Sequence, residues 1–113
     1  MLTKCIEFNV VALIRPNGEV IISDSHHWIN IDSVSHYRWW AQSAGHRKEI
    51  LSKFKALQEM TDVDDREFRE IQTEVVMTDG TILYTKLAPL EVYHLISEAY
   101  SAYEEKRSRR TEY

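Results

Sequence analysis

The chain has 113 residues, of which 43% are apolar and 28% charged, and it carries a formal net charge of −4. This length suits one hydrophobic core and is too short for two, and with only three glycines and two prolines the composition excludes a largely disordered chain. The longest apolar run, Val10 to Ile14, falls far short of the roughly 20 residues that cross a bilayer, so we expect no membrane span.

Two features of the sequence indicate the cellular compartment: the N-terminal residues and the number of cysteines. The first residues contain no apolar segment of the kind that a signal peptide needs, so export is not expected. The single cysteine, Cys5, cannot form an internal disulfide. We therefore expect a cytoplasmic protein in a reducing setting, built as one domain over residues 1–113.

The first half of the chain, residues 6–60, begins with a predicted β-hairpin. From residue 6 to residue 14 the pattern alternates with period two, which predicts a strand with one face made of Ile6, Phe8, Val10, Ala12 and Ile14. Pro16, Asn17 and Gly18 favour a tight turn, because proline pre-sets φ and Asn-Gly tolerates positive φ. The β-rich run from Val20 to Ile22 is the expected second strand.

A helix is predicted after this hairpin, from Ser33 to about Ala44, with Asp32 as its N-cap. One side of this helix would carry Val34, Tyr37, Ala41 and Ala44. Gly45 interrupts the pattern, so we expect a second helical segment beyond it that ends near Met60. The acidic residues 61–70 are interpreted as a connector.

The second half, residues 71–107, repeats the order of hairpin and helix. Alternation from Ile71 to Met77 leads into Asp79-Gly80, a favoured two-residue hairpin turn, and then into a strand from Thr81 to Tyr84. Pro89 is preorganised for a first helical turn, so a helix is expected from there, followed by a frayed basic tail at 108–113. The tyrosines expected in the core are Tyr84, Tyr93, Tyr100 and Tyr103.

Together these elements predict an α+β fold, with a four-stranded antiparallel sheet made of two hairpins, each followed by helix in the order ββα-ββα. The sequence does not fix the strand order. The first strand is apolar on both faces near its end, because Val11 and Leu13 point opposite to Val10 and Ala12. Either the middle helices or another chain must cover the second face, so a monomer and a homodimer both remain open.

The residues from 25 to 48 are the expected place for any chemistry, since they hold four of the five histidines and all three tryptophans. His36 and His46 are ten residues apart, which places them on different sides of a straight helix, and the adjacent His26 and His27 lack an HxH or HExxH pattern. The chain also lacks a Walker-type glycine loop and a GxSxG nucleophile. We therefore expect no catalytic group, no metal and no cofactor.

The favoured function is a small non-catalytic binding protein that acts on another protein, as an inhibitor, adaptor or assembly factor of bacterial or phage type. Tryptophan, tyrosine and arginine are enriched in interface hot spots because they combine large contact area with polar groups. The expected binding residues are Trp28, His36, Tyr37, Arg38, Trp39, His46 and Arg47.

Two other classes of function are weighed against this one. One is a small enzyme, or a small-ligand or nucleotide binder, whose pocket lies between the sheet and the first helix and uses His36, His46 and Arg38. The other is nucleic-acid binding through the basic C-terminal residues Lys106, Arg107, Arg109 and Arg110. Nucleic-acid binding is not expected, because the rest of the chain is acidic and is repelled by a phosphate backbone.

Overall fold

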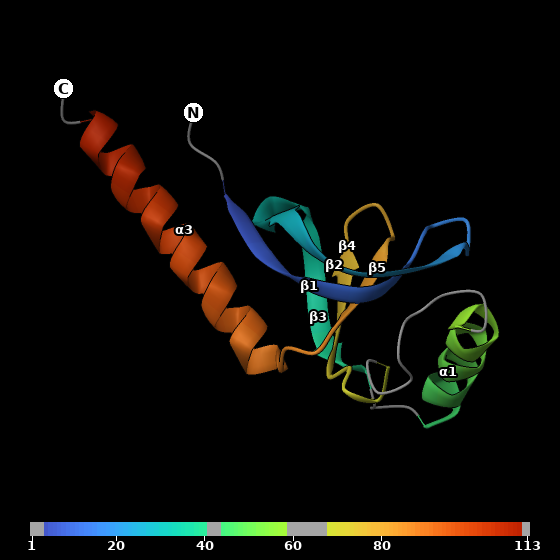
Figure 1. Ribbon diagram of the computed structural model, residues 1–113. Helices are drawn as coiled ribbons and strands as arrows, with labels where there is room; N and C mark the ends of the chain where they lie inside the picture. The colour runs from blue at the N-terminus through green and yellow to red at the C-terminus, as the bar shows by residue number, and fades with distance from the viewer. Residues whose placement is uncertain (1–3, 41–43, 59–67, 112–113) are drawn as a thin grey trace.

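A computed structural model describes residues 4–40, 44–58 and 68–111 (Figure 1). Over these residues the fold is α+β, as expected, but the antiparallel sheet has five strands instead of four, and two helices pack on it. The elements, in chain order, are β1 (Cys5–Ile14), β2 (Val20–Asn30), the 3-10 turn η1 (Ile31–Ser33), β3 (Val34–Trp39), α1 (Ala44–Gln58), β4 (Thr73–Met77), β5 (Ile82–Thr85) and α3 (Pro89–Thr111).

The sheet has the strand order β2-β1-β5-β4-β3, so the first hairpin pairs with the last strand of the second. This pairing is antiparallel and places Ala12 opposite Tyr84 and Leu13 opposite Leu83. The strands β2 and β3 are the two edges, although η1 joins them directly in the chain. In Figure 1, β1 and β2 cross β3, β4 and β5 at a steep angle, so the sheet is strongly coiled.

Both predicted hairpins are present, and their turns use the residues that the sequence indicated. In the first, Asn17 accepts a hydrogen bond from the Glu19 amide at 2.9 Å, and Gly18 has a φ of 88°. In the second, Asp79 accepts from the Thr81 amide at 2.8 Å, and Gly80 has a φ of 95°. Both glycines occupy the left-handed region that residues with a Cβ seldom adopt.

The helix expected from Ser33 to about Ala44 is wrong over its described residues. Val34–Trp39 forms the edge strand β3, which pairs with β4, and Asp32 lies inside η1, whose N-cap is Asn30. A bulge between Val34 and His36 brings Val34 and Tyr37 to the same core despite their spacing of three. The bulge therefore imitates helical spacing in a strand. The helix that does form, α1, runs without a break from Ala44 through Gly45.

A second irregularity sits between β1 and β2. Between the pairs Val10–Ser25 and Ala12–Ile22, β1 contributes one residue and β2 contributes two, one of which is Asp24 with a φ of 39°. At the same place Val10 packs on one side of the sheet and Ala12 on the other. The expectation that alternate residues of β1 share one face therefore fails beyond Val10.

The sheet carries a separate core on each face. The α3-side core is built from the buried residues Ile6, Phe8, Val10, Ile29, Ile31, Val75, Leu83 and Val92. The α1-side core is built from Val11, Ala12, Trp40, Ile50, Phe54, Phe68, Ile71 and Tyr84. The second apolar face, for which the sequence left the cover open, is thus covered by α1 and by Phe68.

The last helix, α3, begins at Pro89 as expected. Val92 is fully buried, and Leu95, Ile96 and Ala99 pack against the α3-side core. The tyrosines only partly follow the prediction. Tyr84 is fully buried, but Tyr93 and Tyr100 are about half exposed on α3. In Figure 1 the helix continues past the sheet, toward the same side as the N-terminus.

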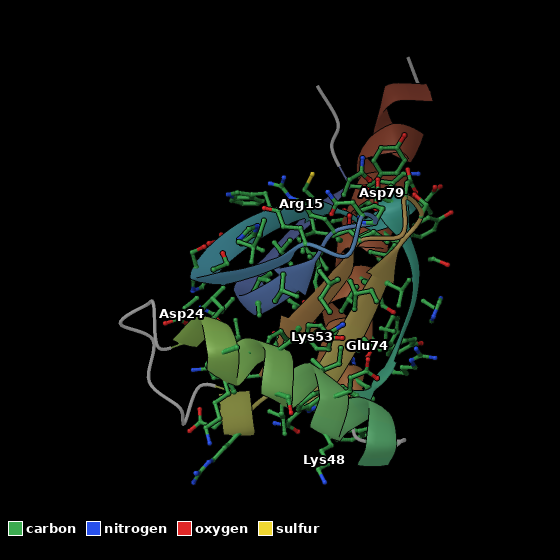
Figure 2. The ribbon with its side chains drawn as sticks, turned by 90° about the vertical axis from the view of Figure 1, so that its right-hand side faces the viewer. Arg15, Asp24, Lys48, Lys53, Glu74 and Asp79 are labelled. Atoms are coloured by element: carbon green, nitrogen blue, oxygen red, sulfur yellow. The ribbon has the colours of Figure 1, made fainter. Side chains whose placement is uncertain are left out.

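If α1 covers the sheet as described, Phe54→Ala should be strongly destabilising. Phe54 is fully buried and its ring contacts Phe68 and Tyr84 at centroid distances of 5.3 and 5.4 Å. We expect a loss of about 3–5 kcal/mol in the free energy of unfolding, measured by urea denaturation. Lys48→Ala is the control, because Lys48 is exposed on the same helix (Figure 2), and it should change stability by less than about 0.5 kcal/mol.

Candidate functional site

The predicted binding residues of β3 are divided between the two faces of the sheet. His36 and Arg38 pair with Val76 and Glu74 and point to the α1 side, because strand residues alternate. Tyr37 packs against the α3-side core, and Trp39 follows it on that face. The four side chains therefore do not form one common surface on this strand.

Arg38 is held by a buried carboxylate. Its Nε and Nη2 donate to the same oxygen of Glu74, at 3.2 and 2.8 Å. The Glu74 side chain is only 1% exposed, whereas that of Arg38 is 50% exposed. Figure 2 shows Glu74 between the sheet and α1. A carboxylate buried to this extent needs its cation, so the first role of Arg38 is to stabilise the fold.

The buried charge also affects its neighbour Tyr84. Burial raises the pKa of the Tyr84 hydroxyl well above its usual value, and the negative charge of Glu74 raises it further. The guanidinium of Arg38 acts in the opposite direction. Tyr84 thus keeps its proton in the folded protein, and the aromatic rings of Trp40 and Phe54 pack edge-on against it.

The histidines do not converge in the described residues. His36 is exposed, and its Nδ1 lies 3.1 Å from the Ser35 hydroxyl. His46 and Arg47 belong to α1, but their side chains lie outside the described residues. Over residues 4–40, 44–58 and 68–111, no group of three or more His, Cys, Asp or Glu side chains is arranged to hold a metal ion.

The three tryptophans have three different environments. Trp40 is buried, and its indole nitrogen donates to the Ile71 carbonyl at 2.6 Å. Trp39 is 48% exposed near the end of β3, and Trp28 is 73% exposed on β2 at the other edge of the sheet. Trp39 and Trp40 are adjacent in the chain, but only Trp40 belongs to the core.

Trp39 lies close to the start of α3. It pairs with Thr73, whose hydroxyl donates to the carbonyl of Leu87, two residues before the helix begins. In the first turns of α3, Leu90 is 65% exposed and Tyr93 is 51% exposed. Figure 1 shows the end of β3 near the start of α3. We call Trp39, Leu90 and Tyr93 the junction surface; the sequence missed its helical part because it assigned Tyr93 to the core.

A cleft of about 430 Å³ lies apart from these residues, between β2 and the β4–β5 turn. It is lined by Leu13, His27, Trp28, Ile29, Asn30, Ser33, Met77, Thr78, Asp79, Thr81 and Leu83. Of the predicted binding residues only Trp28 belongs to it. The sequence did not reveal the cleft, because its walls come together only when β1 pairs with β5 and η1 crosses toward β3.

None of the helices in the described residues is apolar over a length that would cross a membrane. Comparisons of the chain with models of known protein families, with curated proteins and with solved structures find no match. Any function must therefore be argued from the residues of this chain.

Alkaline unfolding should be sensitive to Tyr84. The unfolded tyrosine ionises near pH 10, whereas the folded residue resists ionisation, so its contribution to stability is complete below about pH 10 and is lost as the pH rises further. We expect the free energy of unfolding of the Tyr84→Phe variant to fall less steeply above pH 10 than that of the wild type. Urea denaturation between pH 8 and pH 11 measures this, with exposed Tyr93→Phe as the control; equal slopes for all three proteins would contradict the assignment.

The Arg38–Glu74 pair should show strong coupling in a double-mutant cycle. Arg38→Ala removes the guanidinium that donates two hydrogen bonds to the buried carboxylate, so we expect a loss of about 1–3 kcal/mol. In a Glu74→Met background the same replacement should cost much less, because no buried charge is left to compensate. Chemical denaturation of the four proteins gives the coupling free energy, and additive effects would show that the pair is not coupled in solution.

Proposed function

We propose that this chain is a small non-catalytic binding protein whose partner is another protein, and that the junction surface makes the central contact. The observation that carries the proposal is the exposure of Trp39, Leu90 and Tyr93 where β3 meets α3. Large apolar side chains exposed together are typical of interaction surfaces, and tryptophan and tyrosine dominate interface hot spots.

The backbone beneath these side chains supports the same proposal. β3 is an edge strand that pairs only with β4 in the described sheet, and edge strands can add a strand from a partner. Val92 anchors the first turns of α3 in the core, so Leu90 and Tyr93 are presented on a fixed helix. Such preorganisation lowers the entropy lost on binding.

The enzyme or ligand-binding alternative in the space between the sheet and α1 has less support. Trp40, Phe54 and Tyr84 pack there in the α1-side core. Arg38, one of the three residues that this alternative would use, is engaged by Glu74. The proposal includes a reducing cytoplasmic setting, with which the free, partly buried Cys5 is consistent.

The proposal is tested by affinity capture from cells of the natural source, with wild type and Trp39→Ala compared. If Trp39 is a hot spot, its replacement should weaken the captured complex by about 2 kcal/mol, or roughly 30-fold in Kd, measured by calorimetry with the purified partner. Leu90→Ala should weaken the same complex.

Ser35→Ala is the matched control, since Ser35 is an exposed residue of the same strand, and it should leave the Kd unchanged. Circular dichroism verifies that each variant is folded. A partner retained at full affinity by Trp39→Ala and Leu90→Ala contradicts the assignment of the junction surface. Recovery of the chain itself as the sole partner, with concentration-dependent sedimentation, redirects the proposal to a homodimer.

A further inference from the structure

We propose that the cleft between β2 and the β4–β5 turn binds a small organic molecule that has an apolar body and a positively charged group. This site is separate from the junction surface, and the inference does not depend on the proposed function. Its volume of about 430 Å³ falls within the range of roughly 300–1,000 Å³ that is usual for small-molecule pockets.

The floor of the cleft is apolar and well supported. Ile29 and Leu83 belong to the α3-side core, and Leu13 and Met77 pack against that core. None of the α3 side chains that the structure describes lines the cleft, so it opens where the helix does not cover this face of the sheet. An apolar ligand body that enters it would bury surface on both sides, which is favourable by about 25 cal/mol per Å².

The polar groups of the cleft are fixed before any ligand binds. The imidazole Nε2 of His27 lies 2.7 Å from the Ser23 hydroxyl and 3.2 Å from the Ser25 hydroxyl, which holds the ring in one orientation. On the opposite side, the Thr78 amide donates to the Ser33 carbonyl at 2.8 Å and ties the β4–β5 turn to η1. A preformed site of this kind loses little entropy on binding.

The charge of the lining selects a cation. Among the described residues that line the cleft there is no lysine or arginine, and Asp79 is the one carboxylate. The Thr81 amide that donates to Asp79 holds the pKa of this carboxyl below its usual value, so the side chain stays ionised. Arg15 in the neighbouring turn is ion-paired with Glu19 at 3.5 Å and does not line the cleft. A carboxylate or phosphate ligand would thus meet the negative charge of Asp79 without a lysine or arginine in the described lining to compensate it.

Phenethylamine and 3-phenylpropionate form the test pair, since they share an aromatic body and differ in the sign of their charge. Titrated into the full chain and followed by NMR, phenethylamine should shift the resonances of Leu13, Met77 and Leu83 in a saturable way at millimolar concentration. The acid should bind more weakly.

Asp79→Asn keeps the oxygen that caps the turn and removes only the charge, so it should weaken phenethylamine binding by roughly 1.5- to 5-fold, as expected for an exposed ion pair. Asp24→Asn is the matched control: it makes the same charge change outside the lining, and asparagine tolerates the positive φ found there. Thr81→Trp, which places a large side chain in the cleft, should abolish binding.

Three results would overturn the proposal: no saturable shift with either probe, shifts that map outside the lining residues, or an undiminished affinity in folded Thr81→Trp. Equal affinity for the two probes, or equal effects of the Asp79 and Asp24 replacements, would overturn the cationic assignment.

Discussion

Burial of the strand β1 on both faces is the constraint on which the rest of the structure depends. Val10, Val11 and Ala12 are consecutive and all fully buried, which requires cover on both sides of the sheet. One helix cannot supply this, so α3 covers one face and α1 the other. The pairing of β1 with β5 brings Tyr84 opposite Ala12 in the α1-side core, where its ring contacts those of Trp40 and Phe54. The buried Glu74 on β4 is paired with Arg38 on the edge strand β3.

The sequence predicted the parts of the fold that are determined by local chemistry. The two turns, the start of the last helix at Pro89 and the α+β class depend on residues such as Gly18, Gly80 and Pro89, whose backbone preferences are strong. The two-sided burial of β1 could also be inferred, because Val10 to Ile14 is an unbroken apolar run. Each of these conclusions needs only a few neighbouring residues.

The helix wrongly expected from Ser33 lies where a bulge changes the phase of a strand. Val34 and Tyr37 are three residues apart and share a face, which is helical spacing unless a bulge intervenes. Whether Val34–Trp39 becomes strand or helix is decided by β4, which arrives more than thirty residues later in the chain and satisfies its backbone hydrogen bonds. The candidate sites could not be predicted for the same reason. Alternation along β3 places Arg38 and Trp39 on opposite faces of the sheet, and the cleft is formed by strands that are far apart in the chain.

The position of α3 explains why two separate surfaces, the junction surface and the cleft, are left uncovered. Its apolar stripe, from Val92 to Ala99, packs against the core, and farther along the ring of Tyr103 lies 4.3 Å from the ammonium of Lys4, which is also paired with Asp32. These contacts fix the helix along one part of the face. Its first turns must then extend beside the end of β3, where Leu90 and Tyr93 stay exposed, and the region near the β4–β5 turn is left without cover. The junction surface and the cleft therefore both expose apolar side chains that α3 does not cover.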